Sequence, residues 1–224
     1  MVEHLLQAAR GGARLDEPSW FTGRTVEVDR VVGWVRARRP GMYVVTGSAG
    51  TGKSAIVGRV VSLSNPAERE RLYQDRLRAD GRRWEHEDPG ERSVQAHAHA
   101  RAVTADRLAD LLGEQLARAE LLLRQELRRN ANELLGQVQR AVEEGMAPPV
   151  VVVDGLDEAR GEAFSIAEDF LVRLAAHAVV IVSTRELRRG DDQPSLVSTL
   201  LPGAGGVGCP AGPGRRRRAG PRAG

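Results

Sequence analysis

The sequence predicts an α/β fold of three layers, in which a mostly parallel sheet is covered by helices on both faces. Four short apolar runs, at residues 42–46, 94–100, 150–153 and 178–183, alternate with segments whose apolar residues recur at helical spacing. The last two runs consist almost entirely of Val and Ile, which is typical of strands buried on both faces. We therefore expect these two strands in the interior of the sheet.

Helix signals lie between the apolar runs. Thr25 can cap a first helix whose valines at positions 28, 31, 32 and 35 share one face. Thr104 can cap a longer helix after the second run, and Asn132 begins another that Gly145 ends. A further helix contains Phe164 and several other apolar residues before the fourth run. Each helix can bury one apolar face against the sheet.

The net charge of the 224 residues is +3, but it is unevenly distributed. Residues 201–224 contain five arginines and no acid, whereas residues 1–200 carry 28 basic and 30 acidic side chains. This nearly neutral main part predicts no specific nucleic-acid partner. The N-terminus lacks the pattern of a signal peptide, no apolar stretch is long enough for a bilayer, and Cys209 is the one cysteine. We expect a cytoplasmic protein that does not bind membranes.

Composition divides the chain into three regions: a lead segment at residues 1–19, one α/β domain at 20–201 and a tail at 202–224. Within the domain, 15 of the 29 residues at 64–92 are charged, with both signs interleaved. We expect this segment to be a solvated excursion with a short helix that Pro66 opens and Gly81 ends, and a partner-binding surface is the alternative. The tail is rich in Gly, Pro and Arg, which predicts disorder and is also compatible with translation out of frame.

A glycine-rich loop between the first strand and the next helix carries the clearest chemical pattern. It fits G-x-x-x-x-G-K-[ST], the phosphate-binding P-loop, whose backbone N–H groups surround an anion at a helix N-terminus. Lys53 is the single lysine among 33 basic residues, and its compact ammonium can reach outer phosphates where a planar guanidinium fits poorly. The hydroxyl of Ser54 is a candidate Mg²⁺ ligand. The residues of the loop are Gly47, Ser48, Ala49, Gly50, Thr51, Gly52, Lys53 and Ser54.

Three carboxylates follow the third predicted strand. Asp154 ends the run of four valines and is the candidate on the metal side of a P-loop site. Asp157 and Glu158 come within one turn of it, where either can orient or deprotonate a water molecule, and we place Asp157 ahead of Glu158 for this catalytic role. The alternative is that both acids only stabilise a helix N-terminus.

Arg185 follows the fourth predicted strand. Because parallel strands deliver their carboxyl ends to one edge of a sheet, this arginine is expected at the terminal phosphate of a nucleotide bound by the P-loop. The alternative is an ordinary surface arginine, one of 32 in the chain.

The loop TGSAGTGKS, the segment VVVVDGLDE and the segment VSTR resemble the signal-transduction ATPases with numerous domains, especially their NACHT-type branch and related AAA-type modules. The resemblance spans residues 20–201. It implies ATP and Mg²⁺ as cofactors, a switch whose nucleotide state controls protein partners or self-assembly, and slow hydrolysis. It also places the segment that includes Gly23 and Arg24 beside the adenine and ribose, and makes Arg185 a sensor of the terminal phosphate.

Members of that family usually continue into a fifth strand and further domains, whereas only 39 residues follow Arg185 here. The sequence is therefore expected to be a truncated relative. A module that binds nucleotide without turnover is the first alternative to an ATPase. A P-loop phosphotransferase is a weaker one, with residues 64–92 as its only candidate lid, and a nucleic-acid remodeller is weaker still. His97 and His99 share a strand face, but without a third ligand they do not predict a metal site.

Overall fold

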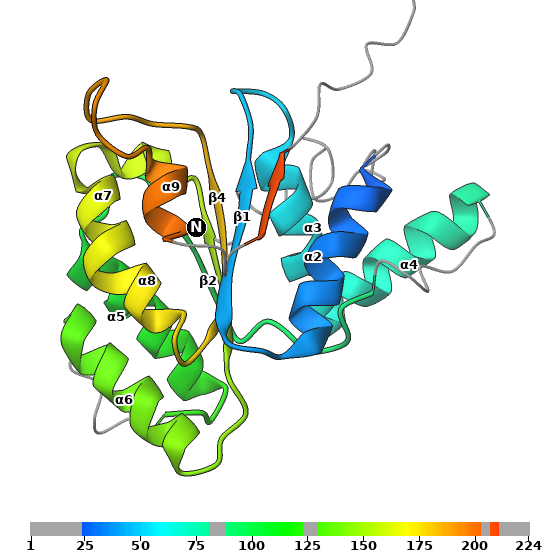
Figure 1. The fold of residues 1–224 in the computed structure, drawn as a ribbon. Coiled ribbons are helices and arrows are strands. Elements are labelled where there is room, and N and C mark those ends of the chain that lie inside the picture. Colours follow the sequence, from blue (N-terminus) through cyan, green and yellow to red (C-terminus); the bar gives the residue numbers. More distant parts are fainter. Residues whose placement is uncertain (1–23, 81–87, 123–129, 203–206, 211–224) are drawn as a thin grey trace, which may run out of the picture.

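The computed structural model describes residues 24–80, 88–122, 130–202 and 207–210, and its centre is a five-stranded sheet (Figure 1). All pairings in this sheet are parallel, and the strand order is β2-β3-β4-β1-β5. The predicted α/β fold with a parallel sheet is therefore confirmed, with β3 and β4 in the interior. The strands are β1 (Gly41–Thr46), β2 (Ala96–His99), β3 (Val150–Asp154), β4 (Val179–Thr184) and β5 (Val207–Pro210).

The register brings the carboxyl ends of β1, β2, β3 and β4 to one edge of the sheet. Thr46 of β1 pairs with Thr184 of β4, and His99 of β2 pairs with Asp154 of β3. Val153 pairs with Val182, which aligns the ends of the two interior strands. The loops after all these strands consequently meet at the upper end of the sheet in Figure 1.

Helices cover both faces of the sheet, as predicted. The valines of α2 and the buried side of α3 pack on the face that carries Tyr43, Val45 and Ile181. The opposite face, with Val153 and Val182, packs against α5, α6 and the helical segment before β4. Figure 1 shows these two groups of helices on opposite sides of the strands. The helices are α2 (Thr25–Ala37), α3 (Lys53–Ser64), α4 (Pro66–Asp80), α5 (Ala105–Arg118), α6 (Ala131–Glu143), η2 (Leu156–Glu162), α7 (Ala163–Ser165), the π-helical η3 (Ile166–Leu171), α8 (Val172–Leu174) and α9 (Leu196–Leu200).

One of the two predicted helix caps is confirmed. The Thr104 side chain accepts a hydrogen bond from the Arg107 N–H and caps α5. Helix α6 begins earlier than predicted, because Asn130 caps it while Asn132 lies in its first turn. Helix α2 has Thr25 as its first residue and Arg24 at the cap position, without a side-chain hydrogen bond. A sequence pattern places the start of a helix only to within one or two residues, and the tertiary structure determines which residue is the cap.

The charged segment at residues 64–92 is more firmly packed than predicted. Pro66 opens a helix as expected, and this helix, α4, packs against α3. Leu72 of α4 is 1% exposed, so one apolar side chain of the segment belongs to the protein interior. Gly81, the predicted end of this helix, lies outside the described residues.

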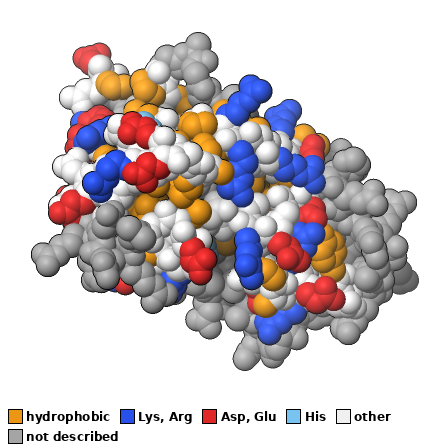
Figure 2. Space-filling view, turned by 90° about the horizontal axis from the view of Figure 1, so that it is seen from below, with side chains coloured by type: hydrophobic (Ala, Val, Ile, Leu, Met, Phe, Trp, Pro, Cys, Tyr) orange, Lys and Arg blue, Asp and Glu red, His pale blue; other side chains and the backbone are white. Residues whose placement is uncertain are grey.

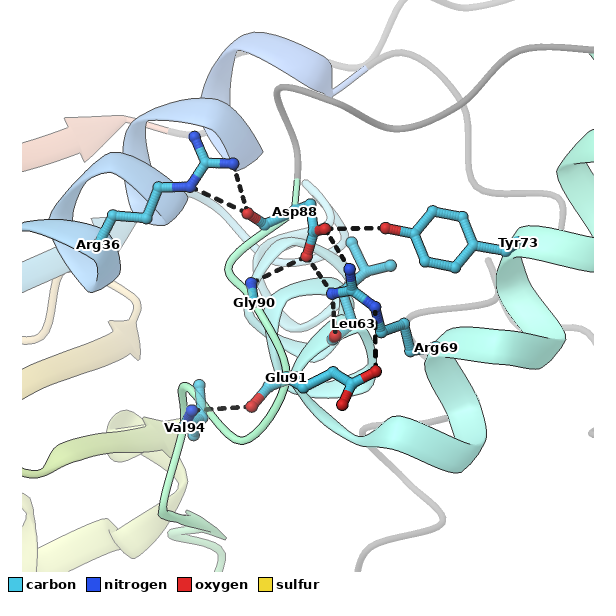
Figure 3. Close-up of polar contacts among 9 residues, drawn as sticks. Arg36, Leu63, Arg69, Tyr73, Asp88, Gly90, Glu91 and Val94 are labelled. Atoms are coloured by element: carbon cyan, nitrogen blue, oxygen red, sulfur yellow. Dashed lines mark hydrogen bonds and ion pairs between the residues drawn. The ribbon is translucent and has the colours of Figure 1, made fainter.

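Asp88 anchors the chain as it returns from this excursion (Figure 3). Its carboxylate accepts two hydrogen bonds from the Arg69 guanidinium and one from the Tyr73 hydroxyl at 2.9 Å. Its backbone oxygen accepts hydrogen bonds from the Nε and Nη2 atoms of Arg36, and the N–H of Gly90 also donates to the carboxylate. One residue thereby ties α4 and the last turn of α2 to the segment that leads into β2.

The tail differs from the predicted disorder at one place. Residues 207–210 form β5, which runs parallel to β1 and pairs with it over four residues. Without this strand, one side of β1 would present unpaired backbone groups, and pairing satisfies them. The other tail residues of the prediction, 203–206 and 211–224, lie outside the described residues.

The surface opposite the P-loop edge carries both signs of charge. Figure 2 shows Lys or Arg side chains interspersed with Asp and Glu on this face, over the described residues. Across the described residues, no helix combines the length and the apolar character needed to cross a membrane.

We expect Asp88→Asn to lower the free energy of unfolding by about 1 kcal/mol at pH 7, because it removes a paired carboxylate that is mostly buried. Burial by itself raises the pKa of the Asp88 carboxyl, but the hydrogen bonds from Arg69, Gly90 and Tyr73 outweigh this and lower it. The stabilisation is therefore complete above the pKa of the unfolded state and is lost as pH falls below about 4.

Urea unfolding of the wild-type chain and the Asp88→Asn variant at pH 7 and pH 3 measures this difference. Glu70→Gln, on the exposed side of α4, is the matched control and is expected to change stability by less than about 0.5 kcal/mol. If the unfolding free energies of the wild-type chain and Asp88→Asn differ by the same amount at both pH values, the lowered pKa of Asp88 is contradicted.

Candidate functional site

The P-loop connects β1 to α3 at the edge where the strand ends meet. Gly50 (φ +72°) and Gly52 (φ +86°) adopt the left-handed backbone conformation, which side chains disfavour. Gly52 also occupies the cap position of α3, where no side chain accepts from the first N–H groups of the helix. The loop therefore directs backbone N–H groups and the positive end of a 12-residue helix to one point, as an anion site requires.

Lys53 closes this loop from the first residue of α3. Its Nζ atom donates hydrogen bonds to the backbone oxygens of Gly47 and Ser48, both at 2.9 Å. Partial burial lowers the pKa of the Lys53 ammonium, although the nearby carboxylates of Asp157 and Asp154 oppose the shift. The ammonium thus lies over the loop, within reach of any anion that the loop amides hold.

Ser54 and Asp154, the two residues expected on the metal side, lie together at this edge. The Asp154 carboxylate is fully buried; it accepts hydrogen bonds from the hydroxyls of Ser183 and Ser54, and its Oδ2 atom lies 3.2 Å from Nδ1 of His99. Burial by itself raises the pKa of Asp154, but its interactions with His99, Ser183 and Ser54 outweigh this and lower the pKa. A buried carboxylate beside a hydroxyl is a fitting oxygen environment for Mg²⁺.

Asp157 and Arg185 form one unit beside the P-loop. The Arg185 Nε atom lies 2.8 Å from one Asp157 carboxylate oxygen, and the Arg185 backbone N–H donates to the other at 2.9 Å. The Asp157 side chain is only 10% exposed, whereas that of Arg185 is half exposed. The two residues predicted separately therefore contact each other, and Asp157 orients the arginine after β4.

Arg24 reaches the P-loop from the start of α2. Its Nη2 atom donates to the backbone oxygen of Thr51 at 2.8 Å, and its Nη1 atom pairs with Glu27 at 2.9 Å. Gly23, predicted beside it, lies outside the described residues. The start of α2 is thus joined to the loop, which places it beside the phosphate cradle.

These elements agree with one family. A model of the family described as AAA ATPase domain matches residues 21–182. The chain belongs to this family. No curated protein matches the chain.

Solved structures with similarity to this AAA ATPase domain share little sequence with it. The chain is 17% identical to the ORC1 protein of Aeropyrum pernix in complex with DNA, with a TM-score of 0.48, covering 93% of this chain and 49% of that one. For Drosophila ORC bound to DNA the values are 18% identity, a TM-score of 0.40, and coverage of 81% and 43%. For Drosophila ORC bound to GC-rich DNA and Cdc6, the identity is 10% and the TM-score 0.37, with coverage of 86% of this chain and 60% of that one. The chain therefore spans about half the length of these proteins.

His99 and Ser183 contact the candidate site of this AAA ATPase domain, and sequence reasoning missed both. His99 lies between Asp154 and Glu158, and Ser183 both donates to Asp154 and accepts a hydrogen bond from the N–H of Gly155 at 2.9 Å. Both residues lie at the ends of predicted strands. Because parallel strands end at one edge of the sheet, their positions at strand ends were the available signal.

His97 and His99 have different neighbours, although they share one face of β2. His97 lines a cavity of about 600 Å³ with Gln115 and Arg118, while His99 contacts the carboxylates after β3. The side chain of Gln115 also bonds the backbone N–H and oxygen of His97, covering the outer edge of β2. Among the described residues, no cluster of three metal-ligating side chains is present.

We expect Gly155→Ala to destabilise the domain by about 1–3 kcal/mol. Gly155 has φ +67°, and a Cβ atom there would lie 2.8 Å from Cε1 of His99. Gly161→Ala, where a Cβ atom would meet nothing within 4 Å, is the control and is expected to be neutral within about 0.5 kcal/mol. Thermal or urea unfolding of both variants tests this, and equal losses would show that the contact with His99 is unimportant.

Proposed function

We propose that this chain is the ATP-binding core of a regulatory ATPase that couples its nucleotide state to protein partners or self-assembly, with slow hydrolysis. The observation that carries the proposal is the meeting of three groups at one sheet edge: the P-loop with Lys53, the buried Asp154 beside Ser54, and Arg185 held by Asp157. The acidic segment at residues 154–158, with a glycine directly after the first acid, supports assignment to the NACHT-like signal-transduction type.

The roles of the binding residues follow from their positions. The loop amides and the Lys53 ammonium bind the phosphates of ATP, and Ser54 with Asp154 binds Mg²⁺, which neutralises phosphate charge when present. Arg185 lies half exposed on the same edge and reports the terminal phosphate by an ion pair. Arg24, bonded to the Thr51 oxygen, positions the start of α2 for the adenine and ribose.

The two acids after β3 have different surroundings, which supports different roles. Both oxygens of Asp157 contact Arg185, so Asp157 acts by positioning this arginine. Glu158 is 37% exposed and leaves room for a water molecule at its carboxylate. We therefore place Glu158 ahead of Asp157 as the residue that orients the attacking water, which reverses the order expected from sequence.

Binding without turnover is the second candidate function. It is favoured by the fact that both acids already have protein partners, Asp157 with Arg185 and Glu158 with His99. A phosphotransferase is less well supported. Its candidate lid, residues 64–92, is anchored by Asp88 to the last turn of α2 and, through Arg69, to the end of α3, far from the first turn of α3 where the P-loop lies.

Other expectations about the cell remain predictions. These are a cytoplasmic location, no membrane binding and no specific nucleic-acid partner. The similar solved structures are described as bound to DNA, so a DNA-binding measurement on this chain is a direct check of the last point. Identifying the input signal and the effector of such a switch requires identifying the proteins that bind it.

We expect Lys53→Ala to weaken ATP binding by about 100-fold or more, because charge-assisted hydrogen bonds to phosphate are each worth about 1.5–3 kcal/mol. Lys53→Arg should also bind weakly, since the wider guanidinium fits poorly over the loop. Isothermal titration with ATP and Mg²⁺ measures both, and Arg39→Ala, an exposed cation after α2, is the control. Unchanged ATP affinity in Lys53→Ala would overturn the proposed site.

We expect Glu158→Gln to keep ATP affinity and to slow single-turnover hydrolysis by about 100-fold or more, as loss of a general base does. Asp157→Asn should instead weaken discrimination between ATP and ADP, because Arg185 loses its partner. Rapid-quench hydrolysis and parallel ADP titrations separate the two effects. Tight ATP binding by the wild-type chain with no hydrolysis would select the binding-only function.

A further inference from the structure

The imidazole of His99 lies between two carboxylates of the proposed nucleotide site. Its Nδ1 atom is 3.2 Å from Oδ2 of Asp154, and its Nε2 atom is 3.4 Å from Oε2 of Glu158. The His99 side chain is 10% exposed and that of Asp154 is fully buried. One ring thus contacts both the metal-side acid and the water-side acid.

The Asp154 carboxylate is held from the two strands that flank β3. Ser183 of β4 donates to Oδ1, and His99 of β2 contacts Oδ2. A carboxylate at the end of a strand otherwise rotates about its side-chain torsions, and two partners on opposite sides prevent this. Its orientation toward Ser54 therefore depends on both neighbours.

The backbone keeps His99 in place. The Ala100 N–H donates to the backbone oxygen of Asp154 at 2.8 Å, and the Ala102 N–H donates to the backbone oxygen of Glu158 at 3.1 Å. Gly155 lies directly against the ring, because a Cβ atom at this residue would be 2.8 Å from Cε1 and 3.1 Å from Nδ1 of His99. The end of β2 is thus fastened to both ends of the segment 154–158.

We propose that His99 is a positioning residue of the nucleotide site, which holds the Asp154 carboxylate in the orientation that binds the cation of a metal–nucleotide complex. This inference rests on the proposed function. Residues that orient a metal-binding group typically change metal affinity by about 10- to 100-fold when removed. The contribution of Mg²⁺ to ATP affinity consequently depends on His99, whereas the P-loop contribution does not.

The test measures the ATP dissociation constant with Mg²⁺ and with EDTA, and takes the ratio as the Mg²⁺ enhancement. His99→Leu is expected to lose about tenfold of this enhancement while its affinity in EDTA stays within about twofold of wild type. His99→Asn is expected to restore it, because the asparagine amide lies close to the position of Nδ1. Ser183→Ala, which frees the other carboxylate oxygen, should resemble His99→Leu.

His97→Leu is the matched control, since it removes the other histidine of β2, which lines a cavity with Gln115 and Arg118. Its Mg²⁺ enhancement should equal that of wild type. Equal losses in His97→Leu and His99→Leu would assign the effect to general destabilisation and overturn the inference. So would full enhancement in His99→Leu, or a wild-type chain that binds ATP equally well with and without Mg²⁺.

Failure of the proposed function has a different result. If the wild-type chain binds ATP neither with Mg²⁺ nor with EDTA, the proposed nucleotide site is wrong, and the inference about His99 is wrong as well. If ATP binds and Lys53→Ala abolishes binding while His99→Leu changes nothing, the proposed function stands and only the role of His99 is overturned.

Discussion

The candidate site depends on one buried carboxylate, that of Asp154. It has no exposed surface, yet its pKa is lowered, because hydroxyl and imidazole donors compensate for the water it has lost. Its two oxygens have neighbours on different strands: Ser183 of β4 donates to Oδ1, and His99 of β2 contacts Oδ2. The parallel pairing of three strands in register is what allows these partners to meet. The electrostatics of the site therefore follow from the sheet, and a shift of one residue in β2 or β4 would leave this carboxylate without its donors.

The same edge separates the functions of the neighbouring acids. Asp157 is engaged at both oxygens by Arg185, so it holds the residue expected to face a terminal phosphate. Glu158, one residue later, is more exposed, and its carboxylate lies 3.4 Å from the His99 ring. The positioning role proposed for Asp157 and the water-orienting role proposed for Glu158 both rest on this difference in contacts. The short turn after Gly155 produces this division, since it directs the two side chains to different neighbours.

Local patterns predicted much of this correctly. The Val/Ile runs predicted interior strands because only a strand covered on both faces places apolar residues at every position. The P-loop pattern predicted the strand, loop and helix that carry Lys53 and Ser54, because glycine spacing and the flanking elements are all local. Contacts between distant segments were beyond such patterns. The packing of Leu72, the anchoring of the charged excursion by Asp88, and the pairing of β5 with β1 all depend on partners far away in the sequence. For the same reason, the composition of the tail predicted disorder where four residues pair with a free strand edge.

By itself, the sequence determined the strand–loop–helix that forms the phosphate cradle and the presence of acids and an arginine after later strands. These depend on backbone preferences and burial patterns within short windows. Only the tertiary structure decided which groups face one another: Asp157 with Arg185, and His99 with Asp154 and Glu158. Such pairs depend on strand order and register, and a sequence pattern specifies neither. The end of β2 illustrates this, because a histidine with no predicted partner becomes the neighbour of two carboxylates once β2 lies beside β3.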